Sequence, residues 1–434
     1  MKAVGIRGVI LLLGVLFLAA CGAGGEDSPV EAEVQTLVLA TVSGNVDREM
    51  VSRFNLAHSD VQIEVKDYSE RGKITDAGID QLMSEIIAGQ IPDIIELGTN
   101  TRQLPVRQLA QKGYLENLWP YIENDPDLGR DSLVKAPIEA AKINGALYFS
   151  FGSVVINTLV GPERITGKRY SWTVENLEEA FQAMPEDSTI VQYCDTKLDM
   201  LYYLFHFNLG HWIDWETGKV SFDDEEFRSY LEFVNEFPLE FDWSDPETVN
   251  EEIGSRMLSG RQMLTNTNIS SPLNVQIMDA AFHEKTAFIG YPTLDGSIGS
   301  CFYFADEQFA MSAACQNKEA AWEFIRLPFL CEKSQIDPAI PVNQEEFDIW
   351  LNCERRLEPL TYSSIEIDLH QPTQEEKDRF LDFFNRVDKV VQVNNTVFHI
   401  VKDQCGPYFA GDKTLDETVN LIQRRVSLYV NEQF

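Results

Sequence analysis

Apolar and polar positions follow two different periods along the first hundred residues of the chain. Continuous or alternating apolar runs predict strands at 36–43, 61–65 and 92–97, and helical spacing of apolar residues predicts helices at 46–57 and 79–87. The first run is apolar throughout, which is typical of a strand buried on both faces. Strands that alternate with helices in this way predict right-handed crossovers and a parallel sheet.

The same patterns continue after Tyr148, where a second lobe is expected to begin. The later predictions are a helix from Thr173, a hairpin over 214–220, a helix over 227–234, a helix capped by Asn317, and a terminal helix that starts at a Thr414–Glu417 capping box. Just over 400 residues would remain after loss of a leader. A chain of that length exceeds what one hydrophobic core usually serves, so two domains are expected.

The first twenty residues have the order of a secretory leader. Lys2 and Arg7 precede an apolar run that is too short to span a bilayer, and Leu18-Ala19-Ala20-Cys21 ends it. This box resembles the lipidation site of bacterial lipoproteins, which implies a lipid on Cys21 and a location on the outer face of the cell membrane. An uncleaved anchor or a chance apolar start is the alternative. Residues 22–33 are small and acidic and predict a flexible tether.

Charge excludes some partners. The formal net charge is −34, and it becomes −36 once the two basic residues of the leader are removed. So acidic a surface repels nucleic acid and anionic lipid headgroups, so that membrane residence must come from the lipid.

The six remaining cysteines and the histidines give no metal signature. Free thiols and disulfides both stay open, because the sequence has no CxxC spacing and an even number of cysteines outside the cytoplasm fixes no pairing. We expect no metal and no cofactor.

Four stretches in order resemble one family. They are Ala88-Gly89-Gln90-Ile91-Pro92-Asp93-Ile94-Ile95, Ile289-Gly290-Tyr291-Pro292-Thr293-Leu294-Asp295-Gly296-Ser297, Asn317-Lys318-Glu319-Ala320-Ala321-Trp322-Glu323-Phe324 and Phe409-Ala410-Gly411-Asp412-Lys413-Thr414-Leu415-Asp416-Glu417. Together they resemble the extracellular solute-binding proteins, family 1, of bacterial carbohydrate ABC importers, and most closely the lipid-anchored members of Gram-positive bacteria.

The resemblance implies an α/β fold of two lobes, of the type II periplasmic-binding-protein kind, with the sugar in the cleft between them. The implied division is 1–20 leader, 21–34 lipidated Cys and tether, 35–150 plus 293–331 lobe 1, and 151–292 plus 332–434 lobe 2. Relatives often carry Gly-Leu-Pro soon after the residue that matches Tyr148, where this chain has Phe149-Ser150-Phe151-Gly152.

Strand-end loops are the expected place for ligand contacts, because ligands of open α/β sheets sit beyond the carboxyl ends of strands. Asn45 follows the first strand, and Thr99 and Asn100 follow the third; both loops match ligand-touching loops of the family, as does the position of Tyr148. Asn45 could instead cap a helix, and Asn100 could be a turn residue.

In the second lobe, Asp195 lies where relatives place a polar contact. Asn266 and Asn268 follow an apparent strand at 263–264, and their period of two predicts that both side chains lie on one side. A surface loop is the alternative for this pair.

Tyr291, Asp295 and Asn395 complete the candidate set. Tyr291 could equally be a core residue or a stacking platform for a sugar ring. Trp212 and Trp215 are left out, because their hairpin matches a part of the family fold remote from the cleft.

The predicted function is capture of a carbohydrate, expected to be an oligosaccharide, by lobe closure and its delivery to an ABC permease. The chain is expected to be a monomer, without enzymatic activity and without nucleic acid as a partner. It lacks the GxxxxGK[ST], GxSxG and HExxH motifs. The alternatives are a secreted glycoside hydrolase, or a sensor or adhesin with the same fold.

Overall fold

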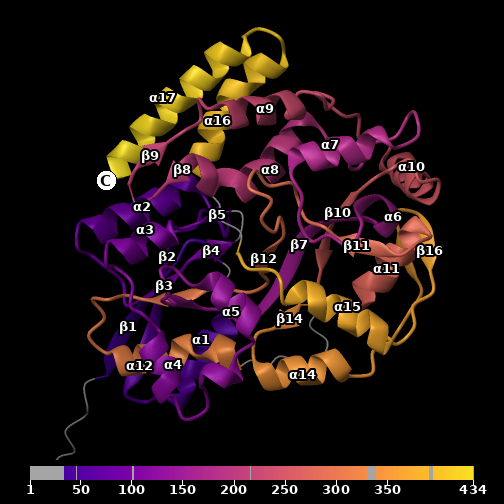
Figure 1. Cartoon of the computed structure of the whole chain (residues 1–434). Coiled ribbons are helices and arrows are strands. Elements are labelled where there is room, and N and C mark those ends of the chain that lie inside the picture. The colour runs from indigo at the N-terminus through magenta and orange to yellow at the C-terminus, as the bar shows by residue number, and fades with distance from the viewer. Residues whose placement is uncertain are drawn as a thin grey trace, which may run out of the picture.

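The structure is a computed structural model that describes residues 34–44, 46–99, 102–215, 217–330, 339–390 and 394–433 (Figure 1). The predicted leader, Cys21 and the tether lie outside these residues. Across the described ranges, every helix is either too short or too polar to cross a lipid bilayer.

The first sheet has five strands in the order β2-β1-β3-β13-β6. They are β1 (Gln35–Thr41), β2 (Val61–Asp67), β3 (Ile94–Glu96), β13 (Phe309–Met311) and β6 (Phe149–Ser150). β1 pairs in parallel with β2 and β3, with Leu39 opposite both Val65 and Ile94. The predicted parallel sheet is therefore confirmed for these strands, whereas β13 joins it antiparallel.

Two capped helices connect the parallel strands. Asp47 accepts hydrogen bonds from the backbone N–H groups of Glu49 and Met50 and begins α1 (Arg48–Ala57), and Thr75 caps α2 (Asp76–Ile87). The N-cap of α1 is therefore Asp47. The other helical elements beside this sheet are α3 (Val106–Gln111), α4 (Trp119–Asn124), η1 (Arg130–Ser132), α5 (Lys135–Ala141), α12 (Lys318–Ile325) and α13 (Leu327–Leu330), and a small hairpin joins β4 (Gly98–Thr99) to β5 (Arg102–Gln103).

The second sheet is built around one long strand, β7 (Ser153–Pro162). Its partners, all antiparallel to it, are β10 (Thr265–Ile269), β11 (Thr286–Phe288), β12 (Cys301–Phe304) and β14 (Ile340–Pro341). The chain passes from the first sheet to the second between β6 and β7, and it returns between β12 and β13. The sequence predicts this return at 293. Residues 301–304 pair with β7, so in the proposed lobe limits they belong with the second sheet.

Helices surround the second sheet and extend above both sheets in Figure 1. They are α6 (Glu163–Thr166), α7 (Val174–Gln182), α8 (Lys197–Trp212), α9 (Glu225–Val234), α10 (Pro246–Leu258), α11 (Leu273–Phe282), α14 (Gln344–Asn352), α15 (Gln374–Phe384), α16 (Asn395–Phe409) and α17 (Leu415–Gln433). Two short hairpins accompany them, β8 (Ile213–Asp214) with β9 (Lys219–Val220) and β15 (Leu360–Tyr362) with β16 (Ile365–Ile367). The predicted capping roles of Asn317 and of Thr414 with Glu417 are confirmed.

The two faces of the second sheet enter different hydrophobic cores. On one face, Phe288 and Phe302 pack against Phe383 and Phe384 of α15. On the other, Leu159 packs into a core formed with α8, α9, α16 and α17. The sheet therefore holds α8 in a fixed position over its second face, which carries the polar groups described below.

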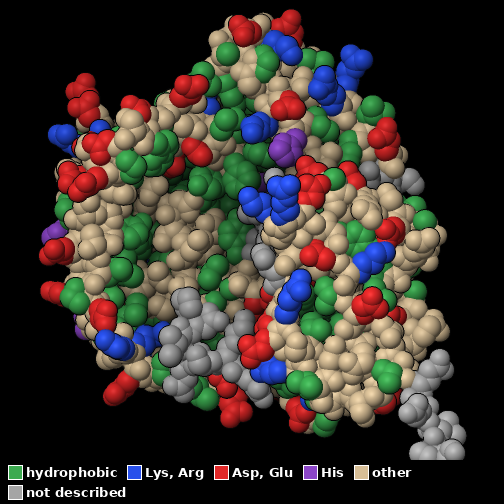
Figure 2. Space-filling model, turned by 180° about the vertical axis from the view of Figure 1, so that it is seen from behind, with side chains coloured by type: hydrophobic (Ala, Val, Ile, Leu, Met, Phe, Trp, Pro, Cys, Tyr) green, Lys and Arg blue, Asp and Glu red, His purple; other side chains and the backbone are tan. Residues whose placement is uncertain are grey.

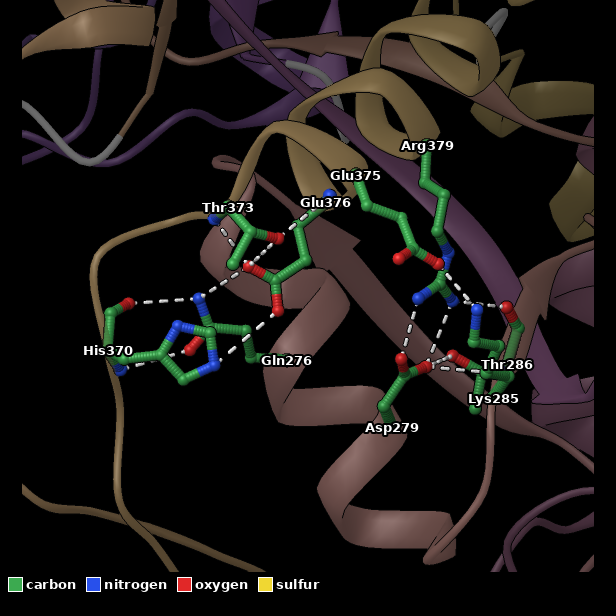
Figure 3. A network of polar contacts seen from close by, with 9 residues as sticks. All are labelled: Gln276, Asp279, Lys285, Thr286, His370, Thr373, Glu375, Glu376 and Arg379. Carbon is green, nitrogen blue, oxygen red and sulfur yellow. Dashed lines mark hydrogen bonds and ion pairs between the residues drawn. The ribbon is translucent and has the colours of Figure 1, made fainter.

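A polar network fastens α15 to α11 and to the start of β11 (Figure 3). The guanidinium of Arg379 binds both carboxylate oxygens of Asp279, at 2.6 and 3.0 Å, and donates to the backbone oxygen of Thr286 at 2.8 Å. Gln276 donates to the backbone oxygen of His370 at 2.9 Å. The bidentate geometry of the Arg379–Asp279 pair fixes orientation as well as distance.

The five described cysteines are free thiols. Cys194, Cys301, Cys315 and Cys405 are buried and Cys353 is half-buried, whereas Cys331 lies outside the described residues. Burial raises the pKa of Cys194 to about 11 and that of Cys315 to about 12, so neither thiol is a ready nucleophile.

Candidate functional site

A cavity lies between the first sheet and the helices above the second. Its volume is about 120 Å³, enough for several water molecules. Its lining comes from distant parts of the chain: Leu97, Leu104–Gln108, Ala140–Ile143 and Phe149, then Leu209, Trp215, Phe304, Gln308, Val390 and Asn394. Cavities at domain junctions are the usual place for a small ligand.

The two tryptophans that the sequence analysis set aside differ in position. Trp212 is fully buried among Phe205, Phe222 and Phe227, as a core residue. Trp215 is half-buried and lines the cavity. The prediction that their hairpin is remote from the cleft is wrong for Trp215, because this residue follows α8 and β8 and reaches the junction.

A group of three asparagines lies across two strands of the second sheet. Asn157, in the middle of β7, donates from Nδ2 to Oδ1 of Asn266 at 3.1 Å and to Oδ1 of Asn268 at 3.0 Å. Both partners lie within β10, so the surface-loop alternative for this pair is wrong and their predicted common side is confirmed. The pairing of Asn268 with Asn157 in the ladder explains it.

Tyrosine rings form a wall next to these amides. Tyr203 of α8 is hydrogen-bonded to Asn266, and burial raises its pKa to about 12 although this hydrogen bond opposes the rise. Tyr303 of β12 lies on the same face of the sheet as Asn157. It stands opposite Val155, which is two residues from Asn157 along β7, and side chains two residues apart in a strand share a face. Tyr202 lies edge to face with Tyr203, and their ring centroids are 5.9 Å apart.

Tyr291 supports this wall from behind. Its ring has no exposed surface and is stacked against Tyr203, with centroids 5.3 Å apart, and Phe207, at 4.6 Å. Of the two roles that the sequence left open for Tyr291, the structure has the core role. Among the described residues, its hydroxyl has no hydrogen-bond partner.

Asp195 is a buried carboxyl at the edge of the same cluster. It is 8% exposed, and its Oδ2 atom has no partner in the described part of the chain. Burial and the negative charge of Asp199 raise its pKa to about 7. Burial and, to a smaller extent, the charge of Asp195 raise the pKa of Tyr203 and of Tyr291. A carboxyl in this state can donate a hydrogen bond when protonated.

The predicted first-lobe contacts lie mostly outside what the structure describes. Asn45 and Asn100 are not among the described residues, and Thr99 is described only as part of the backbone of β4. Gly44 and Gly98, which precede these residues, have φ values of +65° and +91°. The chain therefore turns sharply where β1 and β3 end, as strand-end loops require.

The remaining candidates have local roles. Tyr148 is half-buried and adjoins Phe149, which lines the cavity. Asp295 is exposed and accepts a hydrogen bond from the backbone N–H of Ser297 at 2.9 Å; hydrogen bonds from the Ser297 side chain and from this N–H lower its pKa. Asn395 is half-buried as the first residue of α16, and its neighbour Asn394 caps that helix and lines the cavity.

One group of side chains has the composition of a metal site. His211, Asp224 and Glu226 have ligand atoms within 4.8 Å of one another. Asp224, however, caps α9 through the backbone N–H of Phe227, and the His211 ring is already hydrogen-bonded to Glu226 at 2.5 Å. These contacts account for the three side chains without a metal: Asp224 caps a helix, and His211 pairs with Glu226 at the surface.

The molecule is hollowed on the face shown in Figure 2, near the middle of the view. Hydrophobic side chains and uncharged groups line this hollow, while Lys, Arg, Asp and Glu gather around it and on the outer surface. The lining of the cavity described above differs from this, because it also includes Arg107 and Lys142.

Residues that the sequence analysis missed are Asn157, Tyr203 and Trp215. Asn157 is a polar residue within a run of buried apolar ones, and an interruption of this kind could have been recognised. Tyr203 lies in a helix that is apolar nearly all round, so periodicity does not separate it from core residues.

No protein-family model and no curated protein matches this sequence. Solved structures do match over nearly the whole chain. The sugar-binding protein MalE from Xanthomonas citri gives a TM-score of 0.53 at 13% identity, over 92% of this chain and 98% of that one. A periplasmic oligogalacturonide binding protein from Yersinia enterocolitica gives 0.54 at 13% identity, over 92% and 99%. An ABC substrate-binding protein from Listeria monocytogenes in complex with cycloalternan gives 0.51 at 14% identity, over 92% and 100%.

This chain has the two-lobe α/β fold of the solute-binding proteins. The fold class predicted from the sequence is thus confirmed. A structure described as a de novo designed cysteine esterase also gives 0.54 at 15% identity, over 92% and 99%. Because one solute-binding fold can carry different activities, the function of this chain has to be argued from its own residues.

Proposed function

We propose that this chain is an extracytoplasmic solute-binding lipoprotein that captures a carbohydrate, specifically an oligosaccharide, and delivers it to an ABC permease. The observation that carries the proposal is the amide group of Asn157, Asn266 and Asn268 beside the wall of Tyr202, Tyr203 and Tyr303. Support comes from the fold, which is shared with sugar-binding proteins.

The chemistry of this face fits a sugar. Sugar hydroxyls need hydrogen-bond partners when they are buried, and amides can both donate and accept. Because Asn157 supplies a donor to the Oδ1 atoms of Asn266 and Asn268, the N–H groups of these two amides are directed elsewhere, and Asn268 is exposed. Aromatic rings offer a surface for the apolar side of a pyranose ring.

Binding closes the two lobes on the ligand, since only the closed form satisfies the contacts of both. The proposed contacts are Asn45, Thr99, Asn100 and Tyr148 from the first lobe, and Asp195, Asn266, Asn268, Asp295 and Asn395 from the second, with Tyr291 as the support of Tyr203. Trp215 joins this set because it lines the cavity. The chain acts as a monomer, catalyses no reaction, and is held at the outer face of the membrane by lipid on Cys21.

A titration of the mature protein with a panel of neutral oligosaccharides tests the proposal, with intrinsic tryptophan fluorescence and calorimetry as the two measurements. Fluorescence is informative because Trp215 lines the cavity and Trp212 provides a buried reference. We expect saturable binding of at least one oligosaccharide. Absence of binding across the panel would contradict the proposal.

The same samples separate binding from hydrolysis. After long incubation, chromatography of the oligosaccharide should show it unchanged, because binding alone breaks no bond. Shorter products formed by the purified protein would favour the glycoside hydrolase alternative instead.

A further inference from the structure

The carboxylate of Glu96 lies at the base of the first lobe's strand-end loops. Glu96 is the last residue of β3, and only 1% of it is exposed. Its hydrogen-bond partners among the described residues are three backbone N–H groups and one hydroxyl, and it makes no ion pair there. A buried charge without a cation requires such donors.

These donors come from two different loops. Oε2 accepts from the hydroxyl of Thr41 at 2.8 Å and from the backbone N–H groups of Val42 and Ser43, both at 3.3 Å. Oε1 accepts from the backbone N–H of Gly98 at 2.9 Å. One carboxylate thus joins the loop after β1 to the loop after β3.

The joined segments end in sharp turns. Gly44, directly after Ser43, has a φ of +65°, and a Cβ there would lie 2.3 Å from Oγ of Ser69. Gly98 itself has a φ of +91°. The Thr41 hydroxyl also accepts from the N–H groups of Ser43 and Gly44, at 3.2 and 3.3 Å, so that the first loop is held at three successive residues.

We infer that Glu96 is a positioning residue for ligand binding: its carboxylate fixes the separation and direction of the two first-lobe loops. The inference rests on the proposed function, because these loops lead directly into three of the proposed contacts. A shared anchor holds the starts of both loops, at Val42, Ser43 and Gly98, in one arrangement, so the ligand does not have to order these backbone segments separately on binding.

Asp93, the residue directly before β3, provides a matched control at the other end of this strand. Its Oδ2 accepts from the backbone N–H of Val38 in β1 at 2.9 Å, so it too joins the two strands through a carboxylate. The N–H of Val38, however, lies at the amino side of the pairing of β1 with β3, away from the strand-end loops.

The experiment compares Glu96→Gln with Asp93→Asn in the mature protein, using an oligosaccharide that the wild type binds. In Glu96→Gln, an NH2 group replaces one carboxylate oxygen, and this group donates hydrogen bonds but does not accept them. We therefore expect the Kd to rise about tenfold, which is the effect of one lost charge-assisted hydrogen bond. Asp93→Asn should leave the Kd within about twofold, although both variants lose a few degrees of melting temperature. Equal loss of affinity in both variants, or none in a folded Glu96→Gln protein, overturns the inference.

A second variant and a second measurement keep the test decisive. If Glu96→Gln does not fold, Thr41→Val keeps the carboxylate and removes only the hydroxyl, and a severalfold rise in Kd is expected.

If the wild type binds no oligosaccharide, the proposed function fails, and the backbone amide signals of Gly44 and Gly98 in an NMR spectrum still test the link between the two loops. They should shift in Glu96→Gln and not in Asp93→Asn; unchanged signals in both overturn the inference.

Discussion

Two aspartates, one near each sheet, are buried to the same extent and have opposite surroundings. Asp125, beside the first sheet, and Asp195, beside the second, are each 8% exposed. Asp125 accepts hydrogen bonds from the backbone N–H of Leu128, from Nε1 of Trp322 and from Nη1 of Arg326. Asp195 has an oxygen with no partner among the described residues. Asp125 is thus satisfied within the protein, whereas Asp195 keeps an acceptor or donor for something else.

The largest expected effect comes from pH. The pKa of Asp195 is raised from an ordinary value near 4 to about 7. Between these two pH values, the folded state therefore holds a proton on Asp195 that the unfolded state has lost. Its stabilising contribution is present below pH 4 and is lost as the pH rises through 7. Replacement by Asn removes this loss, so Asp195→Asn should be more stable than the wild type at pH 8, by up to about 4 kcal/mol, and the difference should shrink toward pH 4. Urea unfolding at several pH values measures it.

Asp125→Asn is the matched control with the opposite sign. Burial alone would raise the pKa of Asp125, but hydrogen bonds from the Asp127 backbone, Arg326 and Trp322 outweigh it and lower the pKa. Its contribution is present at neutral pH and is lost as the pH falls below 4. Asp125→Asn should therefore destabilise the protein at pH 7. If both variants changed stability in the same direction at pH 8, the contrast between the two regions would be wrong.

The next effect concerns the amides of the second sheet. Asn157→Leu keeps the volume and removes the donor that orients Asn266 and Asn268, so we expect an affinity loss of about a hundredfold, equivalent to about 2–3 kcal/mol. Asn55→Leu is the control, because Asn55 also bridges two segments, bonding the N–H and C=O of Ile63 at 2.7 and 3.1 Å. Calorimetric Kd values that rise equally in both variants would make the amide group a structural feature alone.

The same contrast explains what the sequence could predict. In the first lobe, the proposed site follows from topology, because parallel strands end at one edge and the apolar run of β1 reveals them. In the second lobe, the proposed site depends on residues that are neighbours only across strands. Asn157 is hydrogen-bonded to Asn266 and Asn268, which lie more than a hundred residues later in the sequence, and no local pattern encodes that pairing. Tyr291 illustrates the reverse case, since a motif places it in order along the chain but does not determine that its side chain is buried.

The smallest of these effects separates two neighbouring tryptophans. Trp215→Ala removes a ring from the cavity lining, and we expect about tenfold weaker oligosaccharide binding with little change in stability, since one aromatic contact contributes about 1 kcal/mol. Trp212→Ala empties a fully buried site and should instead cost about 3–5 kcal/mol of unfolding free energy. Fluorescence of each variant assigns the ligand-induced signal: it should disappear in Trp215→Ala and persist in Trp212→Ala at temperatures where that protein is folded. A signal that survives in Trp215→Ala would mean that the ligand binds outside the cavity, closer to the tyrosine wall alone.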